Sequence, residues 1–132
     1  MSRFSPPATP APWRKLAFSN SQATTTSATM ADGISATTSF PDSGNWLLYG
    51  QACVWAGTAN DVARIAIVAN GVTCNEFRVT CATTNDFYVE TLVGGELSTG
   101  EVAKIMYARA AGSGTIYVQH QVLWALRVPD GV

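Results

Sequence analysis

Few residues in this sequence have the type and spacing that catalysis requires. His120 is the single histidine of the chain, so a serine, histidine and aspartate site would have to use it as the general base. Its expected strand face also carries Val118, Val122 and Trp124, which are apolar. Such surroundings favour a buried structural histidine or an interface residue over a catalytic one.

The acidic residues form no catalytic pair in the sequence. Most of them fall in predicted turns, and they are Asp42, Asp61, Asp86, Glu90, Glu96 and Glu101. Because glycoside hydrolysis needs two facing carboxyl groups, glycosidase chemistry is unsupported. The chain also lacks a glycine-rich phosphate loop and a dense run of calcium ligands. We therefore expect neither an enzyme nor a bound cofactor.

The three cysteines, Cys53, Cys74 and Cys81, add little chemistry. An odd number leaves at least one of them unpaired within the chain. Cys53 lies in an apolar strand and is expected to be a small buried hydrophobe. Cys74 and Cys81 flank a possible hairpin, which leaves a disulfide open, although a reducing cytosol opposes it. With no closely spaced cysteine pair and one histidine, we expect no metal site.

The element around which these residues are arranged is a predicted strand over residues 46–56. Side chains alternate between the two faces of a strand. One face carries Leu47, Tyr49, Gln51, Cys53 and Trp55, and the other carries Trp46, Leu48, Gly50, Ala52, Val54 and Ala56. Neither face is polar, whereas an antiparallel strand usually has one solvated face. One face is expected to meet the core of the chain and the other a second copy of it.

The remaining segments also predict strands. Turn residues separate them, and Asn70-Gly71 is a strong hairpin signal. The expected strands cover residues 16–19, 34–40, 63–69, 76–81, 87–93, 102–110 and 115–128. No segment has a sustained helical period, so the fold class is all-β, an antiparallel two-sheet sandwich or barrel. We assign residues 16–132 to this domain.

Residues 1–15 form a proline-rich basic arm in this interpretation. Four of the six prolines lie here, and proline favours extended backbone without donating hydrogen bonds. Its charged and aromatic residues are Arg3, Phe4, Trp13, Arg14 and Lys15. The arm is either a disordered tail or a segment that orders on an acidic neighbour, with the two aromatics as anchors.

Composition excludes several functions. Only 13% of the 132 residues are charged, about half the usual share, which suggests much surface buried against partners. A net charge of −1 opposes nucleic-acid binding, which relies on many basic contacts to phosphate. No run is long enough to span a membrane, and no secretory signal begins the chain. We expect a protein made in a cytosol, without nucleic-acid or membrane partners.

The order of features resembles a known superfamily over residues 36–128. Pro41 and Gly44 form a turn before an aromatic strand with Tyr49, a later strand ends at Asn70-Gly71, and a turn at Gly100 precedes the long closing strand. This resembles the jelly roll of the tumour necrosis factor and complement globular-head superfamily. The resemblance implies an antiparallel two-sheet jelly-roll sandwich that assembles as a trimer about a threefold axis.

The short length and the proline-rich basic arm favour a viral variant of this resemblance. Nothing in the sequence looks like a fibre shaft, which favours capsid decoration over a fibre tip. The leading hypothesis is a structural protein, a trimeric decoration or cement protein on the outer capsid surface of a tailed bacteriophage, assembled in the host cytoplasm. Its partners would be itself and the major capsid protein. The capsid-anchor candidates are Arg3, Phe4, Trp13, Arg14 and Lys15. The trimer-interface candidates are Trp46, Leu48, Tyr49, Trp55, Tyr117, His120 and Trp124.

The alternative hypothesis is a receptor- or glycan-binding module of a phage tail fibre or spike. A third is a bacterial ligand of the same fold that acts at a cell surface. Carbohydrate sites usually expose aromatics among polar loop residues. The loops of this chain carry small polar residues instead, as in 58–61, 83–86 and 112–114, which favours decoration over glycan binding.

Overall fold

The computed structural model describes residues 13–37, 44–84, 88–97 and 101–128, and these residues form nine strands. The strands are β1 (Arg14–Ser19), β2 (Ala23–Thr25), β3 (Ala31–Thr37), β4 (Gly44–Ala56), β5 (Val62–Ala69), β6 (Val72–Thr80), β7 (Tyr88–Leu97), β8 (Val102–Ala111) and β9 (Ile116–Arg127). Within these ranges there is no helix long and apolar enough to cross a bilayer.

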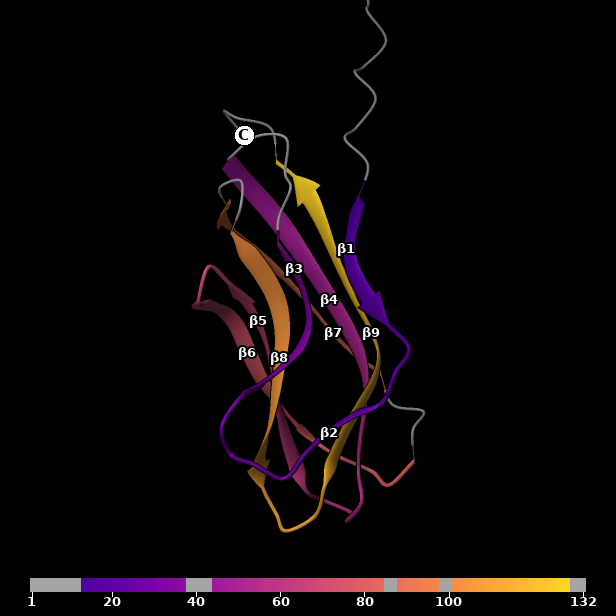
Figure 1. Cartoon of the computed structure of the whole chain (residues 1–132). Helices are drawn as coiled ribbons and strands as arrows, with labels where there is room; N and C mark the ends of the chain where they lie inside the picture. The colour runs from indigo at the N-terminus through magenta and orange to yellow at the C-terminus, as the bar shows by residue number, and fades with distance from the viewer. Residues whose placement is uncertain (1–12, 38–43, 85–87, 98–100, 129–132) are drawn as a thin grey trace, which may run out of the picture.

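The strands pair into two antiparallel sheets that pack face to face (Figure 1). Sheet A has the order β1-β9-β4-β7, with β2 also paired to β9, and sheet B has the order β3-β8-β5-β6. From β3 onward the chain crosses repeatedly between the sheets, so that strands distant in sequence become neighbours. This is the arrangement of a jelly-roll sandwich, and the predicted fold class is confirmed.

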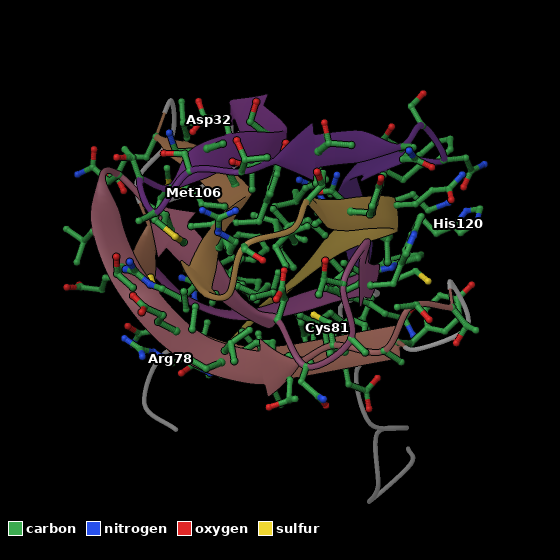
Figure 2. The ribbon with its side chains drawn as sticks, turned by 90° about the horizontal axis from the view of Figure 1, so that it is seen from below. Asp32, Arg78, Cys81, Met106 and His120 are labelled. Carbon is green, nitrogen blue, oxygen red and sulfur yellow. The ribbon has the colours of Figure 1, made fainter. Side chains whose placement is uncertain are left out.

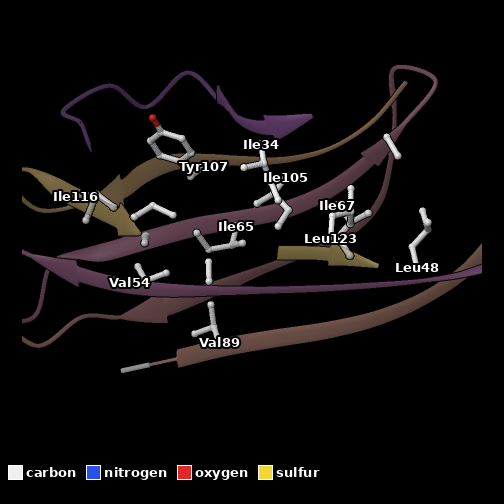
Figure 3. Packing of buried hydrophobic residues seen from close by; sticks show 14 of the residues in the cluster. Ile34, Leu48, Val54, Ile65, Ile67, Val89, Ile105, Tyr107, Ile116 and Leu123 are labelled. Carbon is white, nitrogen blue, oxygen red and sulfur yellow. The ribbon is translucent and has the colours of Figure 1, made fainter. Parts of the chain in front are cut away.

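The core lies between the sheets, where the inward phase of each strand is apolar. From β4 it takes Trp46, Leu48 and Val54, and Figure 3 shows Ile65 and Ile67 of β5 packed in the same layer. Burial of each large side chain of this kind contributes about 1.5–3 kcal/mol. Trp46 and Leu48 are each only 2% exposed within a single chain, so they belong to this core and not to an intermolecular interface.

The hairpin predicted at Asn70-Gly71 is confirmed. Ala69 of β5 pairs with Val72 of β6, and the two residues between them have positive φ angles of 51° and 74°. Two positive φ angles in a two-residue loop define a type I′ turn, whose twist matches that of the flanking strands. This turn fixes the register of one edge of sheet B.

A β-bulge at His120 changes which face of β9 points inward. Gln51 pairs with Val122 but Cys53 pairs with Gln119, so β9 has one residue more than β4 between these pairs. His120 has a φ of 52° and is exposed, and Figure 2, a view from below, places it at one side of the sandwich. The predicted burial of His120, and its shared face with Val118 and Trp124, were therefore wrong.

The first strand begins two residues before the predicted position. Arg14 pairs with Ala125 and Lys15 with Trp124, which makes both residues part of sheet A and not of the preceding arm. No local sequence pattern indicates this pairing, because the partners lie more than one hundred residues apart. Residues 1–12, with Arg3 and Phe4, lie outside the described part of the chain.

Candidate functional site

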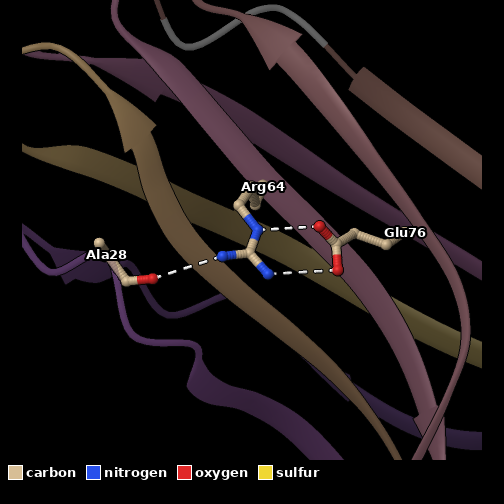
Figure 4. A network of polar contacts seen from close by, with 3 residues as sticks. All are labelled: Ala28, Arg64 and Glu76. Carbon is tan, nitrogen blue, oxygen red and sulfur yellow. Dashed lines mark hydrogen bonds and ion pairs between the residues drawn. The ribbon is translucent and has the colours of Figure 1, made fainter.

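The outer face of sheet B carries paired charges. Arg64 of β5 donates from Nε to Glu76 of β6 over 2.9 Å, and a second nitrogen donates to the Ala28 carbonyl over 3.5 Å (Figure 4). Lys104 of β8 pairs with Asp32 of β3 at 2.9 Å. Charged side chains of this kind are usual on the solvated face of an antiparallel sheet.

The outer face of sheet A is different, because apolar and aromatic side chains dominate it. The strand register aligns two rows of side chains across β1, β9, β4 and β7. The first row is Lys15, Trp124, Tyr49 and Leu92, and the second row is Phe18, Val122, Gln51 and Glu90. We call these two rows, together with Trp13, the aromatic face.

Several side chains of the aromatic face are open to solvent. Phe18 is 60% exposed, Leu92 55% and Trp13 41%. Large apolar side chains that gather on one exposed face mark a binding surface more often than isolated ones do. Trp124 reaches this face only because the bulge at His120 turns the second half of β9 by one residue.

A groove lies on the aromatic face at the first row. It has a volume of about 430 Å³, and the described residues that line it are Trp13, Tyr49 and Trp124. Tyr49 and Trp124 stand on neighbouring strands, about 4.8 Å apart, and Trp13 precedes β1. Side chains on paired strands lose little freedom when a ligand binds, so this groove is the candidate binding site of the described chain.

The polar groups at the edges of the groove have defined partners. The Tyr49 hydroxyl donates a hydrogen bond to the Glu90 carboxylate. This bond, with a smaller contribution from burial, raises the pKa of Tyr49 to about 12, so the phenol stays neutral at physiological pH. On the β1 side, the Lys15 ammonium lies 4.8 Å from the Phe18 ring centroid and 5.3 Å from that of Trp124. Both are cation–π distances.

At the other end of β4 and β9, aromatic side chains of the same chain pack on each other. Trp55 of β4 stacks on Tyr117 of β9, with ring centroids 5.2 Å apart and planes at 7°. Trp55 and Cys53 are buried. Of the predicted interface residues, Tyr49 and Trp124 thus line the groove, whereas the rings of Trp55 and Tyr117 stack on each other within the same chain.

His120 lies outside the groove and forms a local contact. Its Nδ1 is 3.2 Å from Oδ1 of Asn20, and the neighbouring Gln119 donates to the Asn20 carbonyl over 2.9 Å. These contacts hold the segment between β1 and β2 against the bulge. The histidine has no serine or carboxylate of a triad among the contacts described for it.

Asp61 is a carboxylate with a structural contact. Asp61 is buried, and its Oδ2 accepts a hydrogen bond from the Gly114 amide over 2.7 Å, which joins the β4–β5 and β8–β9 loops. Among the residues that the structure places, no group of three His, Cys, Asp or Glu side chains could hold a metal ion. Asp42 and Asp86 lie outside the described residues.

All three cysteines are free thiols in the structure. Cys53 is fully buried, as predicted. Cys81 is also buried, and burial raises the pKa of its thiol, which keeps it protonated and unreactive. Cys74 lies on β6 and is partly exposed.

Of the proposed anchor residues, three lie in the described chain, and two of these lie at the groove. Trp13 lines it and Lys15 lies over Trp124, whereas Arg14 pairs with the buried Ala125, in the opposite phase of the sheet. Sequence analysis did not predict that Trp13 lies beside Tyr49 and Trp124, since it assigned Trp13 to a separate arm. The alternation of Tyr49 with Leu47 and Gln51 was the available indication that Tyr49 faces outward.

Comparison with known proteins gives information on the fold. No protein-family model matches the sequence, and no curated protein does. The C-terminal domain of EclA, a sugar-binding protein, superposes with a TM-score of 0.55 at 8% identity, over 80% of this chain and 78% of that one. A family 35 carbohydrate binding module from Clostridium thermocellum gives a TM-score of 0.52 at 14% identity, over 89% and 100%.

A third similar structure is the CBM36-1 domain of a multidomain xylanase from the hindgut metagenome of Trinervitermes trinervoides. It gives a TM-score of 0.50 at 14% identity, over 92% of this chain and 98% of that one. At such identities the similarity establishes the fold alone. The similar structures include carbohydrate-binding modules, and some are domains of enzymes.

These comparisons overturn the resemblance to the tumour necrosis factor and complement globular-head superfamily. The similar structures include a sugar-binding domain and carbohydrate-binding modules, and nothing in the comparisons supports a phage capsid decoration protein. The resemblance failed because turns and alternating strands at these spacings specify a jelly roll, and this fold is shared by many unrelated functions. The chain is similar in fold to carbohydrate-binding modules.

Proposed function

We propose that this chain is a non-catalytic glycan-binding module whose binding site is the groove between Trp13, Tyr49 and Trp124. The observation that carries the proposal is this aromatic groove on an otherwise open sheet face. The similarity in fold to a sugar-binding domain and to carbohydrate-binding modules supports it. This proposal corresponds to the glycan-binding alternative of the sequence analysis. The expectation there was that a carbohydrate site exposes aromatics in loops, whereas Tyr49 and Trp124 lie on strands.

The chemistry of the groove suits a sugar ring. A pyranose has a flat face of C–H groups that packs on an aromatic ring and removes apolar surface from water. Its hydroxyl groups, at the ring edge, need hydrogen-bond partners. Lys15, Gln51 and Glu90 lie in the two rows beside the groove and offer donors and acceptors at its edges.

Truncation of Trp124 tests the proposal. Truncation of a central aromatic at a binding site costs about 2 kcal/mol or more, which is about thirtyfold in Kd. We expect the wild-type chain to be retarded in native gels that contain a recognised polysaccharide, and Trp124→Ala and Trp13→Ala to lose this retardation. Titration calorimetry with the corresponding oligosaccharide then measures the loss.

Val72→Ala is the matched control. Val72 is an exposed apolar residue of sheet B, far in the sheet order from the groove, and its truncation is expected to leave binding unchanged. Equal binding by Trp124→Ala and wild type, with both variants folded by circular dichroism, would contradict the proposal. So would the absence of retardation by any of a broad set of polysaccharides.

Self-association is a second candidate for the same face. Phe18 and Leu92 are more exposed than Trp13 yet do not line the groove, which leaves apolar surface that a second copy could cover. The homotrimer predicted from the sequence stays a prediction, and its test is given in the Discussion.

A further inference from the structure

The outer face of sheet A is electrically asymmetric. On the β1 side this face carries Lys15, and none of β1, β2 and β9 contains an acidic residue. Arg14 and Arg127 pair with the buried residues Ala125 and Trp46, so they belong to the inward phase of the sheet. The strand on the opposite edge, β7, carries Glu90 and Glu96 and no basic residue. A ligand that lies across the aromatic face therefore meets positive charge at one end and negative charge at the other.

Lys15 is the cation placed closest to the groove. Its ammonium group lies 5.3 Å from the centroid of the Trp124 ring, and Trp124 also lines the groove. A group bound in the groove at the edge of Trp124 therefore lies close to the lysine. The position is fixed from two sides, because the Phe18 ring also lies beneath the ammonium group.

Among the described residues, Lys15 has no carboxylate partner. The ion pairs of the described chain join Arg64 to Glu76 and Lys104 to Asp32, both on sheet B. An ammonium group has three donors, and aromatic rings satisfy its charge only in part. The donors of Lys15 that point away from the rings are thus available to an anion.

We propose that the glycan held in the groove is acidic, and that its carboxylate or sulfate group pairs with Lys15. This inference rests on the proposed function. The Glu90 carboxylate at the other edge repels an anion there, and its remaining lone pairs accept hydrogen bonds from neutral hydroxyl groups. The two edges together orient the chain, with its acidic unit toward β1.

An array of neutral glycans, uronate-containing glycans and sulfated glycans tests the inference. We expect the wild-type chain to bind acidic glycans in preference to their neutral counterparts of the same backbone. The carboxylated and sulfated arms identify which anionic group is recognised. For the best matched pair, calorimetry is expected to show about two- to fivefold tighter binding of the acidic form, the range for a partly exposed ion pair.

Variants of Lys15 assign this preference to the lysine. Lys15→Gln is expected to bind acidic and neutral forms equally, while Lys15→Arg retains the preference. Lys104→Gln, which removes a cation from sheet B, is the control and is expected to retain it. Raising the salt concentration should weaken binding of the acidic glycan more than binding of the neutral one.

The possible outcomes separate the two proposals. If the array shows binding to neutral glycans alone, or if Lys15→Gln keeps the wild-type preference, the inference is overturned while the proposed function stands. If no glycan on the array binds the folded wild-type chain, both are overturned. Binding that Lys15→Gln reduces equally for acidic and neutral forms would reveal a packing role for Lys15 and also overturns the inference.

Discussion

At the scale of single residues, Tyr49 has the most informative environment. Its hydroxyl donates to the Glu90 carboxylate, which favours the neutral phenol and raises the pKa of Tyr49 to about 12. A raised pKa in the folded state stabilises the fold below the ordinary value near 10, and this contribution is lost as the pH rises from about 10 to about 12.

Spectrophotometric titration of the phenolate absorbance checks this prediction. We expect one tyrosine of the native wild-type chain to ionise near 12, and the corresponding pKa to fall toward the ordinary value in Glu90→Gln. Tyr49→Phe should remove that transition. An unchanged titration curve in Glu90→Gln would show that the hydrogen bond does not control Tyr49.

Asp61 is a second residue whose role can be measured. It is buried and accepts a hydrogen bond from the Gly114 amide, so Asp61→Ala leaves a partly buried donor without its partner. We expect a loss of about 1–3 kcal/mol in the free energy of unfolding, measured in urea. Asp32→Ala, which breaks an exposed ion pair with Lys104, should cost about 1 kcal/mol or less. Equal losses would contradict the structural role of Asp61.

At the scale of elements, the hairpin of β5 and β6 depends on backbone conformation at Gly71. Its φ is 74°, and no atom lies within 4 Å of the position that a Cβ would occupy. Gly71→Ala therefore tests strain alone and should lower the free energy of unfolding by about 1–2 kcal/mol. Gly95→Ala has equal space but no positive φ, and it should be neutral or slightly stabilising. Thermal unfolding compares the two.

Sequence patterns predicted the elements better than their partners. The alternation in residues 46–56 and the Asn70-Gly71 turn are local, so β4 and the β5–β6 hairpin were predicted correctly. The pairing of Lys15 with Trp124 depends on contacts across the whole chain, and no local pattern specifies it. The bulge at His120 adds one residue to a regular alternation, so Val118 and Trp124, which were expected on one face, lie on opposite faces.

The candidate site was predicted in part for the same reasons. Tyr49 and Trp124 were recognised as surface candidates, although for a trimer interface. Trp13 was recognised as an aromatic anchor, although for a capsid. The groove that unites them exists only after β1 has joined β9, and this is a property of the assembled sheet.

At the scale of the whole molecule, oligomeric state is the main prediction left to test. The sequence predicts a homotrimer, and light scattering should then give three times the 14.0 kDa mass of one chain. If the aromatic face forms the interface, Trp124→Ala should yield monomers, and a bound glycan should compete with assembly. A stable wild-type monomer at micromolar concentration would contradict the trimer.

The bulge at His120 has an evolutionary consequence. Because the bulge absorbs one residue, deletion of His120 would leave the side chains on both sides of it as they are, with Leu123 and Ala125 inward and Val122 and Trp124 outward. Insertion or deletion of one residue between 121 and 124, with no bulge to absorb it, would instead exchange the inward and outward side chains that follow. The bulge is therefore the position at which β9 can change its length by one residue and still keep its aromatic face.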